Sequence, residues 1–192
     1  MPARILYIKL LHILKQKRSF YFLLTGTFIM MLAMHFSGKP LQIPETTSGI
    51  IALELAPDTA KANAIITAWK NASAPNLNII NRAKLNTWLD FAFLSFYCAF
   101  LCSCLLLLAA RLSSKVSQLL DRAVPVMLFA GLMDIFENAG MLLTMHGFSS
   151  DSIVKMTFIS SVIKWIIVLC ILLLLIYASI LYLISANRKG LN

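Results

Sequence analysis

Four long apolar stretches constrain this chain more than any other feature of its sequence. They cover residues 20–36, 88–110, 124–145 and 159–184. A bilayer core is about 30 Å thick and a helix rises about 1.5 Å per residue, so roughly 20 apolar residues are needed to cross it. Helices are expected because lipid offers the backbone N–H and C=O groups no hydrogen-bonding partner. The sequence therefore predicts an all-α membrane protein with a bundle of four transmembrane helices.

The composition supports this interpretation. The 192 residues are 59% hydrophobic and 13% charged, whereas soluble chains are typically about 45–50% apolar and about 25% charged. The length fits one domain. We therefore expect residues 1–192 to form a single integral membrane domain, and a multidomain soluble enzyme is excluded.

The positive charge is distributed unevenly along the chain. Of the 17 Lys and Arg residues, ten precede the first stretch, lie between the second and third, or follow the fourth. Because Lys and Arg are enriched in cytoplasmic loops, both termini are predicted to be cytoplasmic. The net charge of +9 is then explained by residues that flank membrane helices. Membrane lipids are the expected partners, nucleic acid is not, and assembly into a homo-oligomer stays open.

The segment 37–87, on the predicted outer side, is too long to be a simple turn. Within residues 49–56, alternation places Ile51, Leu53 and Leu55 on one side of an extended strand. Pro57 and Asp58 then indicate the start of a helix. The helix is predicted over residues 58–71, with an apolar stripe formed by Ala62, Ile65, Ile66 and Trp69. We expect this strand and helix to cap the outer end of the bundle, with a surface element that only adds stability as the alternative.

Four ionisable residues fall inside the apolar stretches: Asp90, Asp134, Glu137 and Lys164. Each costs roughly 2.5–3.5 kcal/mol at the centre of a bilayer. Such residues are therefore expected to face the interior of the bundle, to pair with one another, or to serve a function.

The spacing of the polar residues places them on shared helix faces. Asp134, Glu137 and Asn138 lie at positions i, i+3 and i+4, and Asp90 and Tyr97 are seven residues apart. The rise per residue puts all of them, with Lys164, in the outer half of the membrane. The sequence thus predicts one intramembrane polar site, open to the outer side, made of Asp90, Tyr97, Asp134, Glu137, Asn138 and Lys164.

This set of residues suits several kinds of chemistry. Asp134 and Glu137 would repel if both were ionised, so one is expected to hold a proton while Lys164 neutralises the other. Such a pair could contact the polar group of a ligand, act as general acid and base, or relay protons. A hydrogen-bonded network that only fixes helix packing is the structural alternative. His35 and His146 lie at outer helix ends, but no H-x-x-x-H or E-x-x-H pair occurs. We therefore expect no metal and no cofactor.

Three parts of the chain together resemble a group of small bacterial four-helix membrane proteins. They are the run Ile51-Ala52-Leu53-Glu54-Leu55-Ala56 with the later Trp69, the helix that carries Asp90 and Tyr97, and the motif Asp134-x-x-Glu137-Asn138. These features span most of residues 50–141. The resemblance implies the bundle, a bacterial inner (plasma) membrane location and the importance of these polar positions, but it implies no activity.

The leading hypothesis is an integral inner-membrane protein whose acidic pocket binds a lipid-like or other small ligand. A membrane-embedded enzyme that uses the carboxylates as acid and base on a lipid-soluble substrate is the second. A proton-coupled transporter and an assembly partner that acts through the cap are further alternatives.

Overall fold

Long helices make up most of the computed structural model, which describes the chain except residues 1–8, 10, 74, 76, 113 and 190–192. Side chains are also left out of the description at 114, 188 and 189. The four long helices are α2 (Lys17–Gly38), α5 (Ile79–Ala109), α6 (Ser114–Met145) and α7 (Asp151–Lys189). Between α2 and α5 lie the short elements η1 (Lys39–Leu41), α3 (Ile51–Glu54) and α4 (Thr59–Asn71). The described residues contain no strand.

Three of the long helices are apolar enough to cross a membrane. By length and composition, the described residues contain three candidate spans, Lys17–Leu41, Ile79–Ala109 and Asp151–Asn187. The chain therefore fits an all-α, multi-pass membrane protein. Each predicted apolar stretch lies within, or within a residue of, one long helix, and the helices extend beyond it. Helix α6, which carries two of the site acids, is not among the three candidates, so the fourth span stays a prediction.

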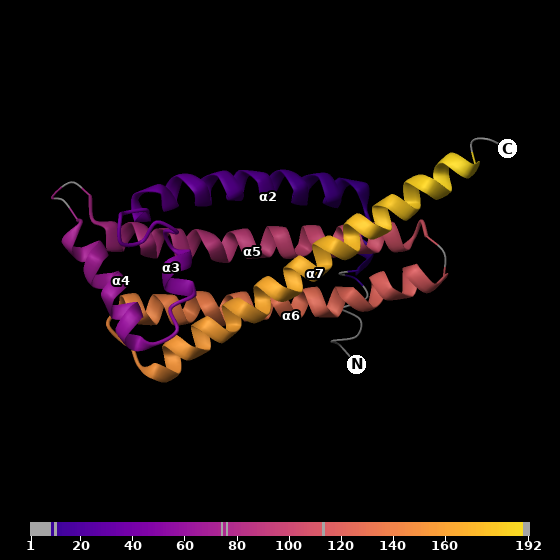
Figure 1. The fold of residues 1–192 in the computed structure, drawn as a ribbon. Helices are drawn as coiled ribbons and strands as arrows, with labels where there is room; N and C mark the ends of the chain where they lie inside the picture. The colour runs from indigo at the N-terminus through magenta and orange to yellow at the C-terminus, as the bar shows by residue number, and fades with distance from the viewer. Residues whose placement is uncertain (1–8, 10, 74, 76, 113, 190–192) are drawn as a thin grey trace.

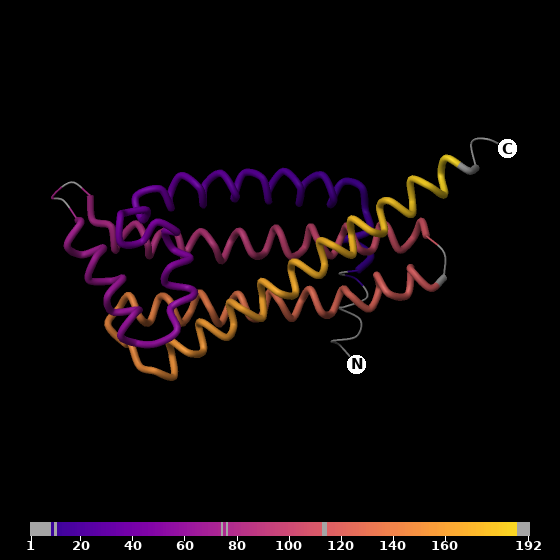
Figure 2. Tube along the Cα trace, viewed as in Figure 1, coloured from indigo at the N-terminus to yellow at the C-terminus, as the bar shows by residue number. Residues whose placement is uncertain are grey.

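The long helices pack side by side with α5 in the middle (Figures 1 and 2). Helix α5 contacts α2 on one side and α6 on the other, and α7 packs along α6. Helix α7 crosses the bundle obliquely, and its C-terminal turns extend beyond the other helices. Helix α2 begins at the same end of the bundle where α5 ends and α6 begins, whereas α3 and α4 lie at the opposite end. We call the first the basic end, because the described residues Lys17, Arg18, Arg111 and Lys115 lie there.

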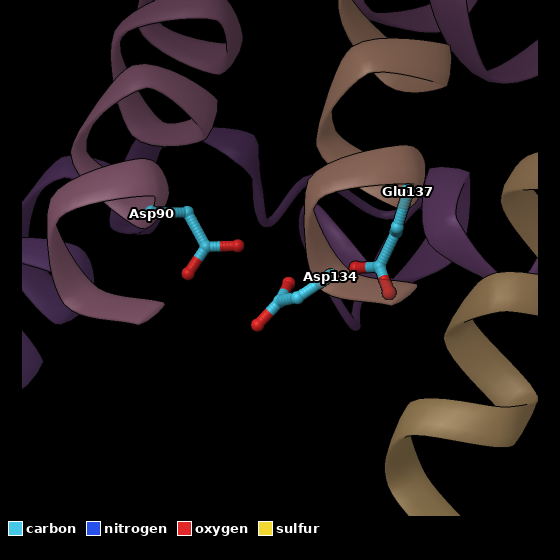
Figure 3. Close-up of side chains that lie close together, drawn as sticks. All are labelled: Asp90, Asp134 and Glu137. Carbon is cyan, nitrogen blue, oxygen red and sulfur yellow. The ribbon is translucent and has the colours of Figure 1, made fainter. Parts of the chain in front are cut away.

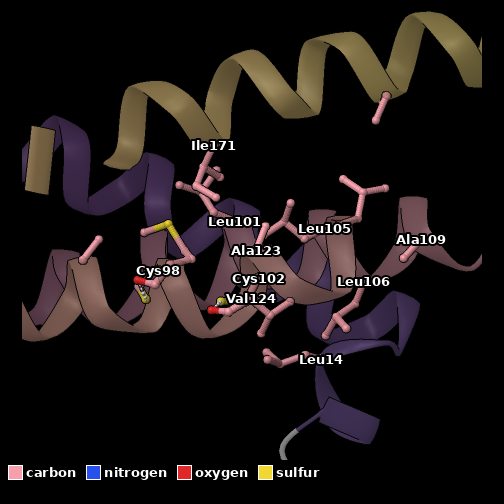
Figure 4. Packing of buried hydrophobic residues seen from close by; sticks show 14 residues of the cluster. Leu14, Cys98, Leu101, Cys102, Leu105, Leu106, Ala109, Ala123, Val124 and Ile171 are labelled. Atoms are coloured by element: carbon pink, nitrogen blue, oxygen red, sulfur yellow. Dashed lines mark hydrogen bonds between the residues drawn. The ribbon is translucent and has the colours of Figure 1, made fainter. Parts of the chain in front are cut away.

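An apolar core joins α5, α6 and α7 in the half toward the basic end (Figure 4). Its fully buried members include Leu105, Leu120 and Met127, and Ile171 joins them from α7. Small residues let the helices approach each other. Gly131 of α6 lies against Cys98 of α5, and Gly140 lies against Thr157 of α7. Close packing of this kind holds helices together in lipid, where burial of apolar surface gives no advantage.

At the opposite end, α3 contacts α6 and α7, and α4 contacts α5 and α7. The predicted helix forms as α4, and Asp58 caps it by accepting a hydrogen bond from the N–H of Lys61 at 2.8 Å. Its stripe is buried as expected, at Ala62, Ile65, Ile66 and Trp69. The Trp69 indole N–H donates to Leu41 O at 3.1 Å and to Thr46 Oγ1 at 2.9 Å.

The strand predicted over residues 49–56 is wrong. Gly49, at φ +62°, turns the chain, and Ile51–Glu54 form the single helical turn α3. A lone strand would leave its backbone groups without partners, whereas this turn bonds its own, with Glu54 N–H donating to Ile50 O at 3.2 Å. The turn buries Leu53 and Glu54 together and leaves Ile51 and Leu55 exposed. The alternating pattern therefore placed Ile51 and Leu55 on the same side as the buried Leu53, which is wrong.

Candidate functional site: a buried acidic cluster

Three carboxylates meet between α5 and α6. Asp90 projects from α5, and Asp134 and Glu137 project from one face of α6, toward the space between the helices (Figure 3). One oxygen from each lies within 4.8 Å of the others. Asp90 is 8% exposed, Asp134 is 1% exposed and Glu137 is fully buried. The i, i+3 spacing on α6 is what places two of these acids on the face that meets α5.

Lys164 of α7 supplies the positive charge of the cluster. Its Nζ donates to Asp134 Oδ1 at 3.1 Å and to Glu137 Oε1 at 2.7 Å. The same ammonium lies 5.2 Å from the centroid of the Trp165 ring. These bonds fix α7 to α6 at the level of the acids.

Tyr97 forms a hydrogen bond with the second carboxylate oxygen of Asp134. Its hydroxyl donates to Asp134 Oδ2 at 2.6 Å, from a position two turns along α5 from Asp90. Asp134 therefore bonds α5 through Tyr97 and α7 through Lys164. It is the acid most firmly held by its surroundings.

Glu54 is a member of the cluster that the sequence reasoning missed. Helix α3 contacts α6 and α7, and it places the buried Glu54 carboxyl beside Lys164, Trp165 and Glu137. Burial raises the pKa of the Glu54 carboxyl above its usual value of 4.5, and the Lys164 charge opposes that rise. The signal in the sequence was a single acid inside the apolar run 50–56, but the predicted strand gave this acid no relation to the site.

Several polar atoms of the cluster have no hydrogen-bonding partner among the described residues. They are Glu54 Oε2, Glu137 Oε2, and both Oδ1 and Nδ2 of the fully buried Asn138. The Asn138 amide lies close to Asp90. Buried polar groups in proteins are nearly always bonded, so unsatisfied atoms at one place call for an explanation.

The structure brings the six predicted residues together: Asp90, Tyr97, Asp134, Glu137, Asn138 and Lys164. That they bind a ligand stays a prediction. His35 and His146 do not join them, since both are exposed and the described group of metal-type ligands contains only the three acids. Asp90, Asp134 and Glu137 are the residues whose oxygens could share a cation, and Lys164 already holds two of them.

The charges of the cluster do not balance. Within the part of the chain that the structure describes, Glu54, Asp90, Asp134 and Glu137 face a single ammonium, that of Lys164, and each of these charged residues is at most 8% exposed. Unpaired ions are costly to bury. The excess acid must therefore carry protons or meet a further cationic or hydrogen-bond-donating group.

Comparison of the chain with protein-family models, with curated proteins and with solved structures finds no match. The resemblance to small bacterial membrane proteins thus stays a prediction, and function has to be argued from the cluster itself.

Proposed function

We propose that the chain is a multi-pass inner-membrane protein that binds a lipid-like or other small ligand at the acidic cluster, through a cationic or hydrogen-bond-donating group of that ligand. In this proposal α6 is a fourth span, both termini are cytoplasmic and the ligand enters from the outer side. The observation that carries the proposal is the excess of four buried carboxylates over one buried ammonium.

Unused bonding capacity supports binding over packing alone. The ion pairs of Lys164 suffice to lock α7 onto α6, and they involve only Asp134 and Glu137. Asp90 and Glu54 are further buried acids that these ion pairs do not involve. Glu54 Oε2, Glu137 Oε2 and the Asn138 amide have no hydrogen-bonding partner among the described residues. A ligand amine could donate hydrogen bonds to Glu54 Oε2, Glu137 Oε2 and the side-chain carbonyl oxygen of Asn138.

The position of α3 supports entry from its side. Glu54 covers the cluster from a single helical turn, between Gly49 at φ +62° and Pro57. Displacement of this short turn would open the cluster without disturbing the long helices. Toward the basic end, the described buried side chains of α5, α6 and α7 are apolar except Ser103, whose hydroxyl donates to Leu14 O at 2.6 Å. The lack of a buried charged group among them favours binding over transport through the chain.

Extraction of bound molecules tests the proposal. Wild-type protein and Glu137→Gln would be purified in mild detergent and compared by native mass spectrometry, followed by solvent extraction and identification of the released molecules. We expect a molecule with an amine or similar polar group in the wild type and its loss from Glu137→Gln. Asp121→Asn, an exposed acid on the same helix, is the matched control and should retain it.

Packing alone predicts a different pattern. Because Glu137→Gln also weakens an ion pair, Leu105→Ala would be included as a control that lowers stability in the apolar core without changing the cluster. Retention of the full set of bound molecules by Glu137→Gln, or their equal loss from Leu105→Ala, would contradict the proposal.

A membrane-embedded acid/base enzyme is the second candidate. It is favoured by the contact of Asp134 and Glu137 with the same ammonium and by the 2.6 Å bond from the Tyr97 hydroxyl, since such a set offers both a proton donor and an acceptor. Incubation of wild type with total membrane lipids should then yield a product of changed mass that Glu137→Gln does not form.

A further inference from the structure

A second site lies at the basic end, far from the acidic cluster. A cavity of about 410 Å³ lies between the first turn of α2, the C-terminal end of α5 and the later turns of α7. At this end of the bundle, α7 crosses toward the outside (Figure 1). Its wall includes Phe20, Leu108 and Leu175, so most of it is apolar.

Among the described residues, two cations border this cavity and no acidic residue does. Lys17 lies at the start of α2, and Arg111 follows the end of α5. Arg111 is held in place by Tyr182 of α7, since its Nη1 donates to the tyrosine hydroxyl at 2.9 Å and its guanidinium lies 5.8 Å from the ring centroid. The remaining N–H groups of the guanidinium are available for a bidentate bond to phosphate oxygens.

We propose that this cavity binds a glycerophospholipid of net negative charge, with its phosphodiester between Lys17 and Arg111 and one acyl chain along the apolar wall. An acyl chain fits Phe20, Leu108 and Leu175, whereas a soluble phosphate would leave that surface in contact with water. Tyr21 and Tyr182 on the wall suit the headgroup level of a membrane, where tyrosine is enriched. A zwitterionic headgroup would add a positive group beside Lys17 and Arg111, and repulsion between like charges favours a lipid of net negative charge.

Lipid titration of the full chain tests this site. Purified protein in detergent would receive phosphatidylglycerol or phosphatidylcholine, and retained lipid would be measured by native mass spectrometry. The wild type should hold one phosphatidylglycerol more tightly than any phosphatidylcholine. The double variant Lys17→Gln, Arg111→Gln should weaken this binding about tenfold or more, because it removes charge-assisted bonds to phosphate.

Two further variants separate a site from general attraction to the basic end. Lys115→Gln with Arg122→Gln removes two exposed cations of the same region that do not line the cavity, and it should leave binding unchanged. Ser179→Phe fills the cavity with both cations in place, and it should weaken binding. Equal losses for the two charge-removing variants, no effect of Ser179→Phe, or displacement of the lipid by soluble glycerol phosphate would each overturn the proposal.

Discussion

The two halves of the bundle use the same helices but are joined by different chemistry. Toward the basic end, α5, α6 and α7 meet through apolar side chains such as Leu105 and Met127. Toward α3, the same helices meet through Asp134, Glu137 and Lys164. Apolar packing holds membrane helices together without burying any ion, whereas a buried ion pair often stabilises no better than apolar residues would. The polar half is therefore the half in which function is expected.

Removal of Lys164 is the harshest test of the polar half. Lys164→Met leaves two buried carboxylates without their partner, and loss of one partner of a buried pair typically costs about 3–5 kcal/mol. We expect a fall of that size in the free energy of unfolding, measured by denaturant or thermal unfolding in detergent. Wild-type stability in Lys164→Met would show that the acids do not need the ammonium, and the charge argument would fail.

A cavity in the apolar half should affect stability but not binding. Leu105 is fully buried, and truncation of such a side chain costs about 2–5 kcal/mol. Leu105→Ala is therefore expected to unfold more readily while it retains the molecule bound at the acidic cluster, as measured by native mass spectrometry. Loss of that molecule from a folded Leu105→Ala protein would show that the two halves are not independent.

Glu54 should link stability to pH. Because burial raises the pKa of its carboxyl above 4.5, its contribution to stability is fully present below about pH 4.5 and is lost as the pH rises through the folded-state value. Glu54→Gln has no such proton to lose. Its melting temperature relative to wild type should therefore rise as the pH is increased above about 4.5.

Glu45→Gln is the control for this titration, since Glu45 is an exposed acid of the same outer segment. The same pH dependence in both variants would show that the effect does not come from burial of Glu54.

Much of the fold could be predicted from the sequence. Length and hydropathy indicate α2, α5 and α7, and Asp58 with the stripe ending at Trp69 indicates α4. The short turn α3 could not be predicted, since its conformation depends on Gly49 and on contacts with α6 and α7. The helices also begin and end at other residues than the apolar stretches do, because polar residues outside those stretches cap them. Asn78 caps α5, since its Oδ1 accepts a hydrogen bond from Asn81 N–H at 3.0 Å.

The site was predictable where a helix period relates its members. Spacing along α6 places Asp134, Glu137 and Asn138 on one face, and the cost of burying Lys164 in lipid indicates that it pairs with them. Glu54 has no such relation to the others, since it reaches the cluster only through the tertiary packing of α3. The cavity at Lys17 and Arg111 likewise depends on how α7 crosses the bundle.

Asp90→Asn tests the central claim most directly, because neither ion pair of the cluster includes Asp90. Its effect on the free energy of unfolding should be the smallest of the series, about 1 kcal/mol or less. Native mass spectrometry should show a bound molecule in the wild type. The same molecule should be lost from Asp90→Asn, although this variant melts at nearly the wild-type temperature. A wild type that retains nothing, or an Asp90→Asn protein that retains the same molecule to the same extent, would contradict the account.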